Sequence, residues 1–305
     1  MREIRIKGTD FHASKAALGC MRIGGLEEAA LDRLIQTALE CQINFFDHAD
    51  IYGGGGCETL FGNYLKKHPS LRDKMIIQSK CGIRKGCYDF SKEHLLQAVD
   101  GILKRLQIEQ LDTLLLHRPD ILVEPEVVAD VFDTLHVAGK VRYFGVSNHN
   151  PMQIALLQKY VKQPIVINQL QFSMTNTTMI DSGVYVNMEN EAAVNRDGSV
   201  LDFCRLHDIT IQAWSPFQYG FFEGTYIGNP KFAQLNGTID ALCEKYQLSN
   251  SALVIAWILR HPAGIQPIIG STNPDRIREI AKAFSTEISH EDWYKLYLAS
   301  GKKLP

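Results

Sequence analysis

Four ionisable side chains follow short apolar runs that are typical of buried strands, and together they could perform acid–base chemistry. They are Asp47, Tyr52, Lys80 and His117. A lysine close to a phenol stabilises the phenolate and lowers its pKa from about 10, and a carboxylate can pair with that lysine. A histidine beside the phenol can donate a hydrogen bond to a carbonyl oxygen. The tyrosine can then give a proton to an oxygen that becomes an alkoxide when a hydride arrives at carbon.

Each of these residues also has an ordinary structural interpretation. A tyrosine after a strand usually packs against its neighbours, Asp47 can cap its turn, and a lone lysine is usually solvated. The order of the four residues along three successive apolar runs favours the catalytic interpretation. The glycines at 53–56 are not followed by the G-K-S or G-K-T of a phosphate loop. They therefore predict a turn with positive φ angles.

A metal-dependent hydrolase is an alternative, because His48 follows Asp47 and His117 stands at another strand end. Such sites use His-x-His pairs or carboxylates clustered at several strand ends, and the sequence has neither. We therefore predict no metal. The seven cysteines are an odd number without a C-x-x-C pair, which predicts reduced thiols in a cytoplasmic protein.

The spacing of the apolar runs predicts the fold. Eight such runs end near residues 19, 46, 79, 116, 146, 169, 213 and 269, and most intervals are about thirty residues long with a helical pattern inside. Eight parallel βα units in about 250–300 residues are typical of a (β/α)8 TIM barrel. A doubly wound open sheet is the rival, but no G-x-G-x-x-G follows a first strand.

The rest of the chain elaborates this barrel. Residues 3–14 predict a small N-terminal β-hairpin, and a last helix is expected to open at Asn273 and Pro274. Two overlong intervals, 171–199 and 216–236, predict extended loops over the C-terminal mouth, where such barrels select substrate. No break in composition divides the sequence, so we expect residues 1–305 to form a single domain.

The composition of the chain limits the classes of binding partner that we expect. The chain has 305 residues, 45% of them hydrophobic, and a formal net charge of -2 without runs of like charge. Nucleic acid and anionic membrane surfaces are therefore poor candidates. No apolar stretch approaches the ~20 residues of a membrane span, and the first residues lack the apolar segment of a signal peptide.

The motifs of this sequence resemble those of the aldo-keto reductase family. The motif D-x-A-x-x-Y-G at 47–53, with Glu58 after it, is similar to that family's most specific signature. The following motifs match in order along nearly the whole chain: Q-S-K at 78–80, L-L-L-H at 114–117, G-V-S-N at 145–148, N-Q at 168–169, W-S-P at 214–216, P-I-I-G-S at 267–271 and R-I-R-E at 276–279. The tail with Trp293 and the G-S-T-N-P-D-R segment resemble bacterial oxidoreductases of uncharacterised substrate.

The resemblance implies reduction of an aldehyde or ketone by NADPH. Tyr52 would be the general acid, Lys80 would lower its pKa, Asp47 would pair with the lysine and His117 would orient the carbonyl. The resemblance assigns cofactor contacts to Gly19, Met21, Arg22, Asp47, Ser147, Asn148, Gln169, Trp214, Ser215, Pro216, Phe217, Ile269, Gly270, Ser271, Thr272, Arg276 and Glu279. Among these, Trp214 would stack on the nicotinamide ring.

The resemblance also implies a preference between the two nicotinamide cofactors. Ser271 and Arg276 would take the 2′-phosphate of NADPH, and no acidic residue stands where it would favour a free 2′-hydroxyl. Gly270 and Ile280 depart from the family, because many members have a phosphate-binding lysine and an amide residue there. We therefore rank NADPH first and NADH second.

The substrate is a small carbonyl compound that the sequence does not name. Six aromatic residues in the expected mouth loops, Tyr88, Phe90, Phe172, Tyr185, Phe217 and Tyr219, favour an apolar or aromatic carbonyl compound. A second hypothesis is a cofactor-sensing subunit of a larger assembly with little turnover, as some barrels of the family are. The complete set of four ionisable residues favours the enzyme. The oligomeric state is not predicted.

Overall fold

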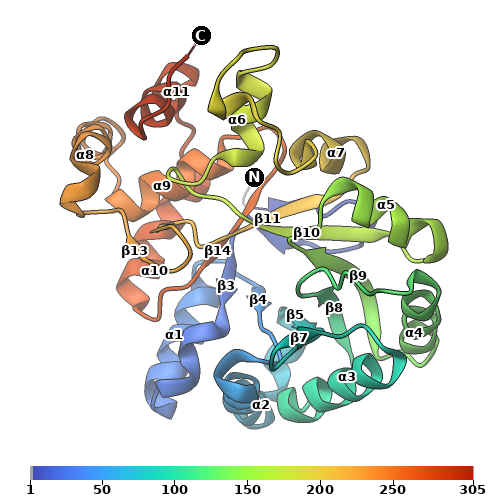
Figure 1. Ribbon diagram of the computed structural model, residues 1–305. Coiled ribbons are helices and arrows are strands. Elements are labelled where there is room, and N and C mark those ends of the chain that lie inside the picture. Colours follow the sequence, from blue (N-terminus) through green and yellow to red (C-terminus); the bar gives the residue numbers. More distant parts are fainter. Residues whose placement is uncertain (1–2, 305) are drawn as a thin grey trace.

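The computed structural model describes residues 3–304, and its centre is a closed barrel of eight parallel strands (Figure 1). Strand β14 pairs with β3 to close the barrel. The eight strands are β3 (Ala17–Gly19), β4 (Phe45–Asp47), β5 (Ile76–Cys81), β8 (Leu111–Leu116), β9 (Val141–Ser147), β10 (Ile165–Gln171), β11 (Thr210–Trp214) and β14 (Gln266–Ile269). This confirms the predicted TIM barrel.

Helices alternate with these strands and cover the outside of the barrel (Figure 1). They are α1 (Glu28–Glu40), α2 (Gly56–Lys67), α3 (Lys92–Leu106), α4 (Pro125–Val137), α5 (Pro151–Tyr160), α7 (Val200–Leu206), α9 (Asn250–Leu259) and α10 (Pro274–Ala281). Helix α8 (Ala233–Tyr246) precedes α9. Apolar stripes on these helices pack against strands that are buried on both faces.

The predicted N-terminal hairpin is present and lies at the opposite end of the barrel from the mouth. Strand β1 (Glu3–Ile4) pairs antiparallel with β2 (Ala13–Ser14). Ala13 of β2 belongs to a buried apolar cluster with Phe45, Ile76 and Ile268 from the barrel strands. This cluster fills the lower interior, as the stacked layers of a TIM barrel require.

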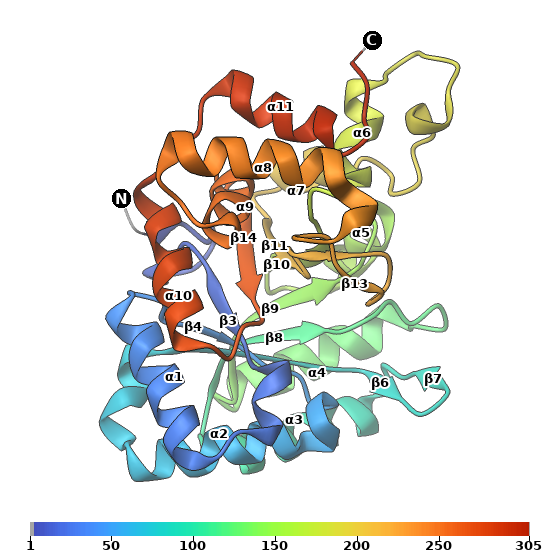
Figure 2. The ribbon, with the colours of Figure 1, turned by 90° about the vertical axis from the view of Figure 1, so that its left-hand side faces the viewer.

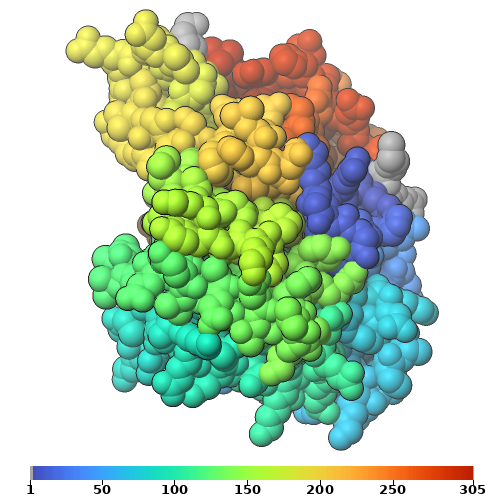
Figure 3. Space-filling view, turned by 90° about the vertical axis from the view of Figure 1, so that its right-hand side faces the viewer, coloured from blue at the N-terminus to red at the C-terminus, as the bar shows by residue number. Residues whose placement is uncertain are grey.

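Two helices were not predicted, and they contact each other. They are α6 (Thr178–Val184) and α11 (His290–Ala299). Asp181 of α6 accepts a hydrogen bond from Tyr297 of α11 at 2.8 Å and pairs with Lys302 at 2.6 Å. Figure 3 shows the yellow segment that contains α6 beside the red C-terminal region. Asn273 and Pro274 do open a helix, α10, but it is not the last one.

Two short hairpins lie around the mouth, and the second of them belongs to the overlong interval 216–236. Hairpins β6 (Ile83–Arg84) with β7 (Cys87–Tyr88) and β12 (Gln218–Tyr219) with β13 (Gly224–Thr225) follow strands β5 and β11. Figure 2 shows the β6–β7 hairpin extending beyond the barrel. Within residues 3–304, the structure has no helix both long and apolar enough to span a bilayer.

Candidate active site

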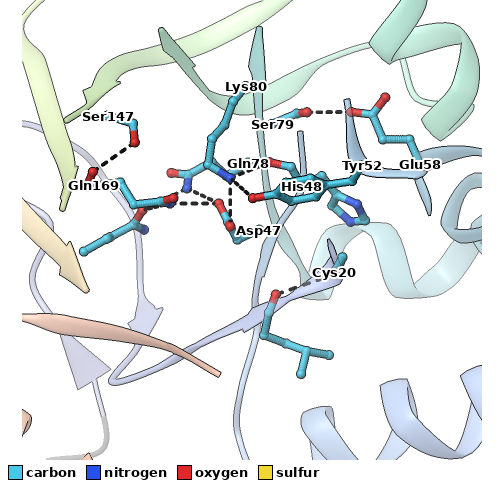
Figure 4. A network of polar contacts seen from close by, with 12 residues as sticks. Cys20, Asp47, His48, Tyr52, Glu58, Gln78, Ser79, Lys80, Ser147 and Gln169 are labelled. Atoms are coloured by element: carbon cyan, nitrogen blue, oxygen red, sulfur yellow. Dashed lines mark hydrogen bonds and ion pairs between the residues drawn. The ribbon is translucent and has the colours of Figure 1, made fainter. Parts of the chain in front are cut away.

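Lys80 is the centre of the polar network at the barrel mouth. Its ammonium donates hydrogen bonds to Asp47 Oδ2 at 2.8 Å, to the backbone oxygen of His48 at 2.7 Å and to the Tyr52 hydroxyl at 3.2 Å. Figure 4 shows the three contacts converging on one nitrogen. Strand alternation explains the position, because Ile76, Gln78 and Lys80 occupy alternate positions of β5 and point inward in successive layers.

A chain of buried glutamines fixes the other carboxylate oxygen of Asp47. Asp47 Oδ1 accepts from Gln78 Nε2 at 2.6 Å and from Gln169 Nε2 at 3.0 Å. Both amides also donate to Gln212 Oε1, at 2.8 and 3.0 Å. Gln212 donates to Gln266 at 2.8 Å, and Gln266 donates to the backbone oxygen of Ser14 in the hairpin at 2.7 Å. Hydrogen bonds through the barrel interior thus link the orientation of Asp47 to the N-terminal hairpin.

The loop that carries Tyr52 needs its glycines. Gly53, Gly54 and Gly55 have φ angles of 57°, 61° and 88°, a region that other residues adopt only with strain. The predicted positive-φ turn is therefore confirmed for these three glycines, whereas Gly56 has a helical φ of -62° and begins α2. Behind this turn, Glu58 accepts from Ser79 at 2.5 Å and from Arg105 at 2.8 Å, which ties the start of α2 to strand β5.

The pKa values of the phenol and of the ammonium are both raised, but for different reasons. Burial raises the pKa of Tyr52 above 10, and the nearby Lys80 charge opposes this without reversing it. Burial works against the Lys80 ammonium, but Asp47 and Tyr52 outweigh it and raise the pKa of the lysine. The expectation of a lowered phenol pKa is therefore wrong as a net direction for this structure. Tyr52 is protonated and Lys80 charged near neutral pH.

His117 stands beside Tyr52 as a neutral imidazole. The two rings lie 6.1 Å apart between centroids in an edge-to-face arrangement. Burial, followed by the charges of Lys80 and Arg118, lowers the pKa of His117 well below its ordinary value. Its Nδ1 is buried without a hydrogen-bond partner within residues 3–304.

A cavity of about 900 Å³ opens above this network. Asp47, Tyr52 and His117 line it, while Lys80 lies beneath its floor. Most of the predicted cofactor-contact residues also line it: Gly19, Met21, Arg22, Ser147, Asn148, Gln169, Trp214, Ser215, Pro216, Phe217, Gly270, Ser271 and Arg276. Ile269 is buried in the core and Glu279 pairs with Lys282. Neither of these, nor Thr272, belongs to the cavity lining.

The strand ends on one side of the cavity carry unusual backbone conformations. Asn148 and Ser215 follow β9 and β11 with φ angles of 59° and 53°. Asn148 Oδ1 accepts from Trp214 Nε1 at 3.1 Å, and Asn148 Nδ2 donates to Ser147 Oγ at 2.7 Å. Left-handed conformations at residues other than glycine cost free energy and concentrate at functional sites. Amide, hydroxyl and indole groups are thereby held together on this wall.

The sequence did not identify several cavity residues. Only Tyr88 and Phe217 of the six proposed aromatic residues line the cavity. Phe90 instead stacks on His149 and Phe172 on Trp257. Phe221 and Phe222, from the turn of the β12–β13 hairpin, line the cavity and pack against Trp214. Arg118 also lines it, and its place directly after His117 was the available signal.

Buried histidines near the site make stability depend on pH. His48 is fully buried and His149 is 3% exposed. Burial lowers the pKa of His48 to about 3, with help from the Lys80 charge, and lowers the pKa of His149 to about 4. Both are neutral in the folded protein at pH 5, whereas in the unfolded chain they bind protons below about pH 6.5.

We therefore expect the free energy of unfolding to fall as pH drops from about 6.5 to 5. Each such histidine contributes a slope of up to about 1.4 kcal/mol per pH unit. Asp50 opposes the trend, because burial raises its pKa to about 7. Urea denaturation of wild type and His149→Asn checks this, since the variant should show a flatter dependence. Identical slopes for the two proteins would contradict the assignment of His149.

Known proteins resemble this chain in sequence over nearly its whole length. The sequence pattern of the Aldo/keto reductase family matches residues 15–297. An uncharacterized oxidoreductase of Bacillus subtilis, YcsN, is 35% identical, with 95% of each chain covered. A 6-dehydroglucose reductase of Novosphingobium aromaticivorans is 34% identical, covering 96% of this chain and 93% of the relative. An NADH-specific methylglyoxal reductase of Escherichia coli is 30% identical, covering 96% of each.

A solved structure shows the same fold. The thermostable aldo-keto reductase Tm1743 superposes with a TM-score of 0.78, covering 98% of this chain and all of that one at 23% identity. The barrel, the polar network beneath its mouth and the match over nearly the whole sequence lead to one conclusion. This chain is an oxidoreductase that belongs to the aldo/keto reductase family.

Proposed function

We propose that this protein reduces an aldehyde or ketone to an alcohol with NADPH, and that Tyr52 is the general acid. The observation that carries the proposal is the Lys80 ammonium, which is fully buried and bonds to both Asp47 and the Tyr52 hydroxyl. A well-packed apolar residue could stabilise the fold at this position at least as well as a buried lysine with these two partners. A charged lysine does, however, assist a neighbouring proton donor that must release its proton to a developing alkoxide.

The roles of the four residues follow from their contacts. Tyr52 faces the cavity and keeps its proton at neutral pH. Lys80 stabilises the phenolate that remains after transfer, because the ammonium lies 3.2 Å from the phenol oxygen. Asp47, held by Gln78 and Gln169, keeps Lys80 charged and oriented. His117 is neutral and can donate a hydrogen bond to the carbonyl oxygen without competing for its proton.

The cavity fits a nicotinamide cofactor. The amide and hydroxyl groups of Ser147, Asn148 and Gln169 offer partners for a carboxamide, and Trp214 offers an aromatic face. A Cβ at Gly270 would meet no atom within 4 Å, so this part of the wall is open. When bound, the cofactor supplies a hydride. The chain's own residues hold the carbonyl and deliver the proton.

Arg276 supports NADPH over NADH. Its side chain is exposed on the cavity rim, where Ser271 also lies, and its guanidinium forms no ion pair with residues 3–304. We expect Arg276→Ala to weaken NADPH binding about 10- to 100-fold and NADH binding much less, because the phosphate loses a charge-assisted partner. Fluorescence titration with both cofactors measures this. Arg278→Ala is the matched control, since Arg278 pairs with Asp275 instead.

Equal losses of NADPH and NADH affinity in Arg276→Ala would contradict the 2′-phosphate role. The reaction itself is tested by NADPH oxidation with a panel of aldehydes, ketones and quinones. Turnover that depends on Tyr52 supports the reductase. Tight NADPH binding without turnover of any compound would contradict it and favour a cofactor-sensing subunit.

A further inference from the structure

The cavity contains a cation that the proposed chemistry does not use. Arg118 follows His117 at the end of β8 and lines the cavity together with Tyr88, Trp214 and Phe222. Its guanidinium carbon lies 5.6 Å from the centroid of the Trp214 ring. The side chain is half-buried, and no carboxylate or other partner within residues 3–304 forms an ion pair or side-chain hydrogen bond with it.

Nearby carboxylates are already engaged. Asp120, two residues farther along, accepts backbone hydrogen bonds from Phe90 at 3.0 Å and Leu122 at 2.9 Å. Asp47 is the carboxylate within the described cavity lining, and it pairs with Lys80. Other half-buried arginines of this chain do have carboxylate partners, namely Arg72, Arg105 and Arg142. Arg118 is thus a partly desolvated donor fork that faces the cavity without an acceptor.

The position of Arg118 in the cavity determines which ligand group it can bind. Arg118 is adjacent to the residue that would orient the carbonyl, and it lines the cavity together with Tyr52 and Tyr88. Arg22, Ser271 and Arg276 line the cavity from the β3 and β14 side, whereas Arg118 projects from β8. A planar guanidinium with five donors matches two neighbouring oxygens, and stacking on an indole pre-organises it. It therefore suits a substrate group near the carbonyl.

We infer that Arg118 is a specificity-determining residue that binds oxygen acceptors on the part of the substrate next to the reacting carbonyl. The substrates are accordingly oxo acids or hydroxyaldehydes, whose carboxylate or hydroxyl oxygens receive the guanidinium. This differs from the apolar or aromatic compound that the sequence favoured. Binding of the plain apolar aldehyde leaves the guanidinium buried without an acceptor, which costs affinity. The inference rests on the proposed carbonyl reduction for its kinetic test only.

The kinetic test compares three aldehydes in wild type and Arg118→Met. Succinic semialdehyde carries a carboxylate, glyceraldehyde carries hydroxyls and pentanal carries neither. Each aldehyde is its own reference between the enzymes, so intrinsic reactivity cancels. We expect Arg118→Met to lower kcat/KM about 10- to 100-fold for at least one of the two oxygen-bearing aldehydes and less than about threefold for pentanal. Methionine keeps an apolar stem on Trp214.

Two further variants complete the comparison. Arg118→Lys keeps the positive charge but loses the planar group with paired donors. If this variant recovers kcat/KM for succinic semialdehyde, the substrate group that Arg118 binds is a carboxylate. If Arg118→Met loses kcat/KM for glyceraldehyde alone, that group is a hydroxyl. Arg84→Met is the control, because Arg84 is exposed on the β6–β7 hairpin, pairs with Asp89 and lies outside the cavity lining. An equal fall for all three aldehydes in Arg118→Met would overturn the inference, since Arg118 would then act on Trp214 or the cofactor. No fall would also overturn it.

A binding measurement keeps this inference separate from the proposed reaction. If wild type reduces none of the aldehydes, the proposed function fails, but Arg118 can still be tested by calorimetric titration with succinate and with threitol. We expect at least one of these to bind wild type about tenfold more tightly than Arg118→Met. Equal affinities, or no binding of either compound to wild type, would overturn the assignment of Arg118.

Discussion

Replacement of Tyr52 by phenylalanine is expected to remove nearly all carbonyl reduction while the protein remains folded. The phenyl ring fills the same space, so only the hydroxyl and its 3.2 Å contact with Lys80 are lost. A positioned general acid contributes about 10²- to 10⁴-fold to rate, and no other phenol lines this end of the cavity beside Lys80 within residues 3–304. Steady-state NADPH oxidation with a reactive aldehyde measures the loss in kcat.

Two controls make the Tyr52→Phe result specific. NADPH affinity should change little, because the hydroxyl faces Lys80 rather than the wall of Ser147 and Asn148. Tyr160→Phe, at the end of α5 far from the mouth, should retain the wild-type rate. A Tyr52→Phe enzyme with more than about a tenth of the wild-type kcat would show that another group donates the proton.

Replacement of Lys80 by methionine is expected to affect stability and activity together. Methionine leaves the Asp47 carboxylate buried and without its counter-charge, and Asp47 is only 2% exposed. Removing one partner of a buried pair typically costs about 3–5 kcal/mol. The Tyr52 hydroxyl also loses the charge that stabilises its anion, so kcat should fall at least about 10²-fold. Urea denaturation and NADPH oxidation measure the two effects.

The double variant Asp47→Asn, Lys80→Met separates these effects. The neutral amide no longer carries an uncompensated charge, so most of the lost stability should return while activity does not. Lys140→Met is the matched surface control, because Lys140 pairs with Asp100 at 2.6 Å with both side chains well exposed. Exposed pairs contribute about 0–1 kcal/mol. Recovery of activity in the double variant would contradict the catalytic role of the charge.

The barrel and the core of its site could be predicted because both depend on local patterns. Asp47 is the last residue of β4 and Lys80 the last but one of β5, and inward-facing positions repeat every second residue. Parallel strands of a closed barrel then bring their carboxyl ends to one mouth. Helix α11 also had a readable signal, since Ser289 caps it and Trp293 and Leu296 follow with helical spacing.

Other features depend on three-dimensional contacts that no local pattern contains. Helix α6 has seven residues, and its Asp181 finds Tyr297 more than a hundred positions away. The chain of Gln78, Gln212 and Gln266 requires the register of three strands to be known. The net direction of the Tyr52 pKa shift requires the balance between burial and the Lys80 charge, which residue types alone do not give.

We propose that a carbonyl carbon receives a hydride beside Tyr52, which acts as one unit with Lys80, Asp47 and His117. This is tested by mass spectrometry of the alcohol that forms when an aldehyde is reduced with NADPH carrying two deuterium atoms at C4. We predict that the wild-type product carries one deuterium at the former carbonyl carbon and that Tyr52→Phe forms almost none of this product. Cofactor oxidation without deuterated alcohol, or equal formation of this alcohol by both proteins, would contradict the proposed reaction.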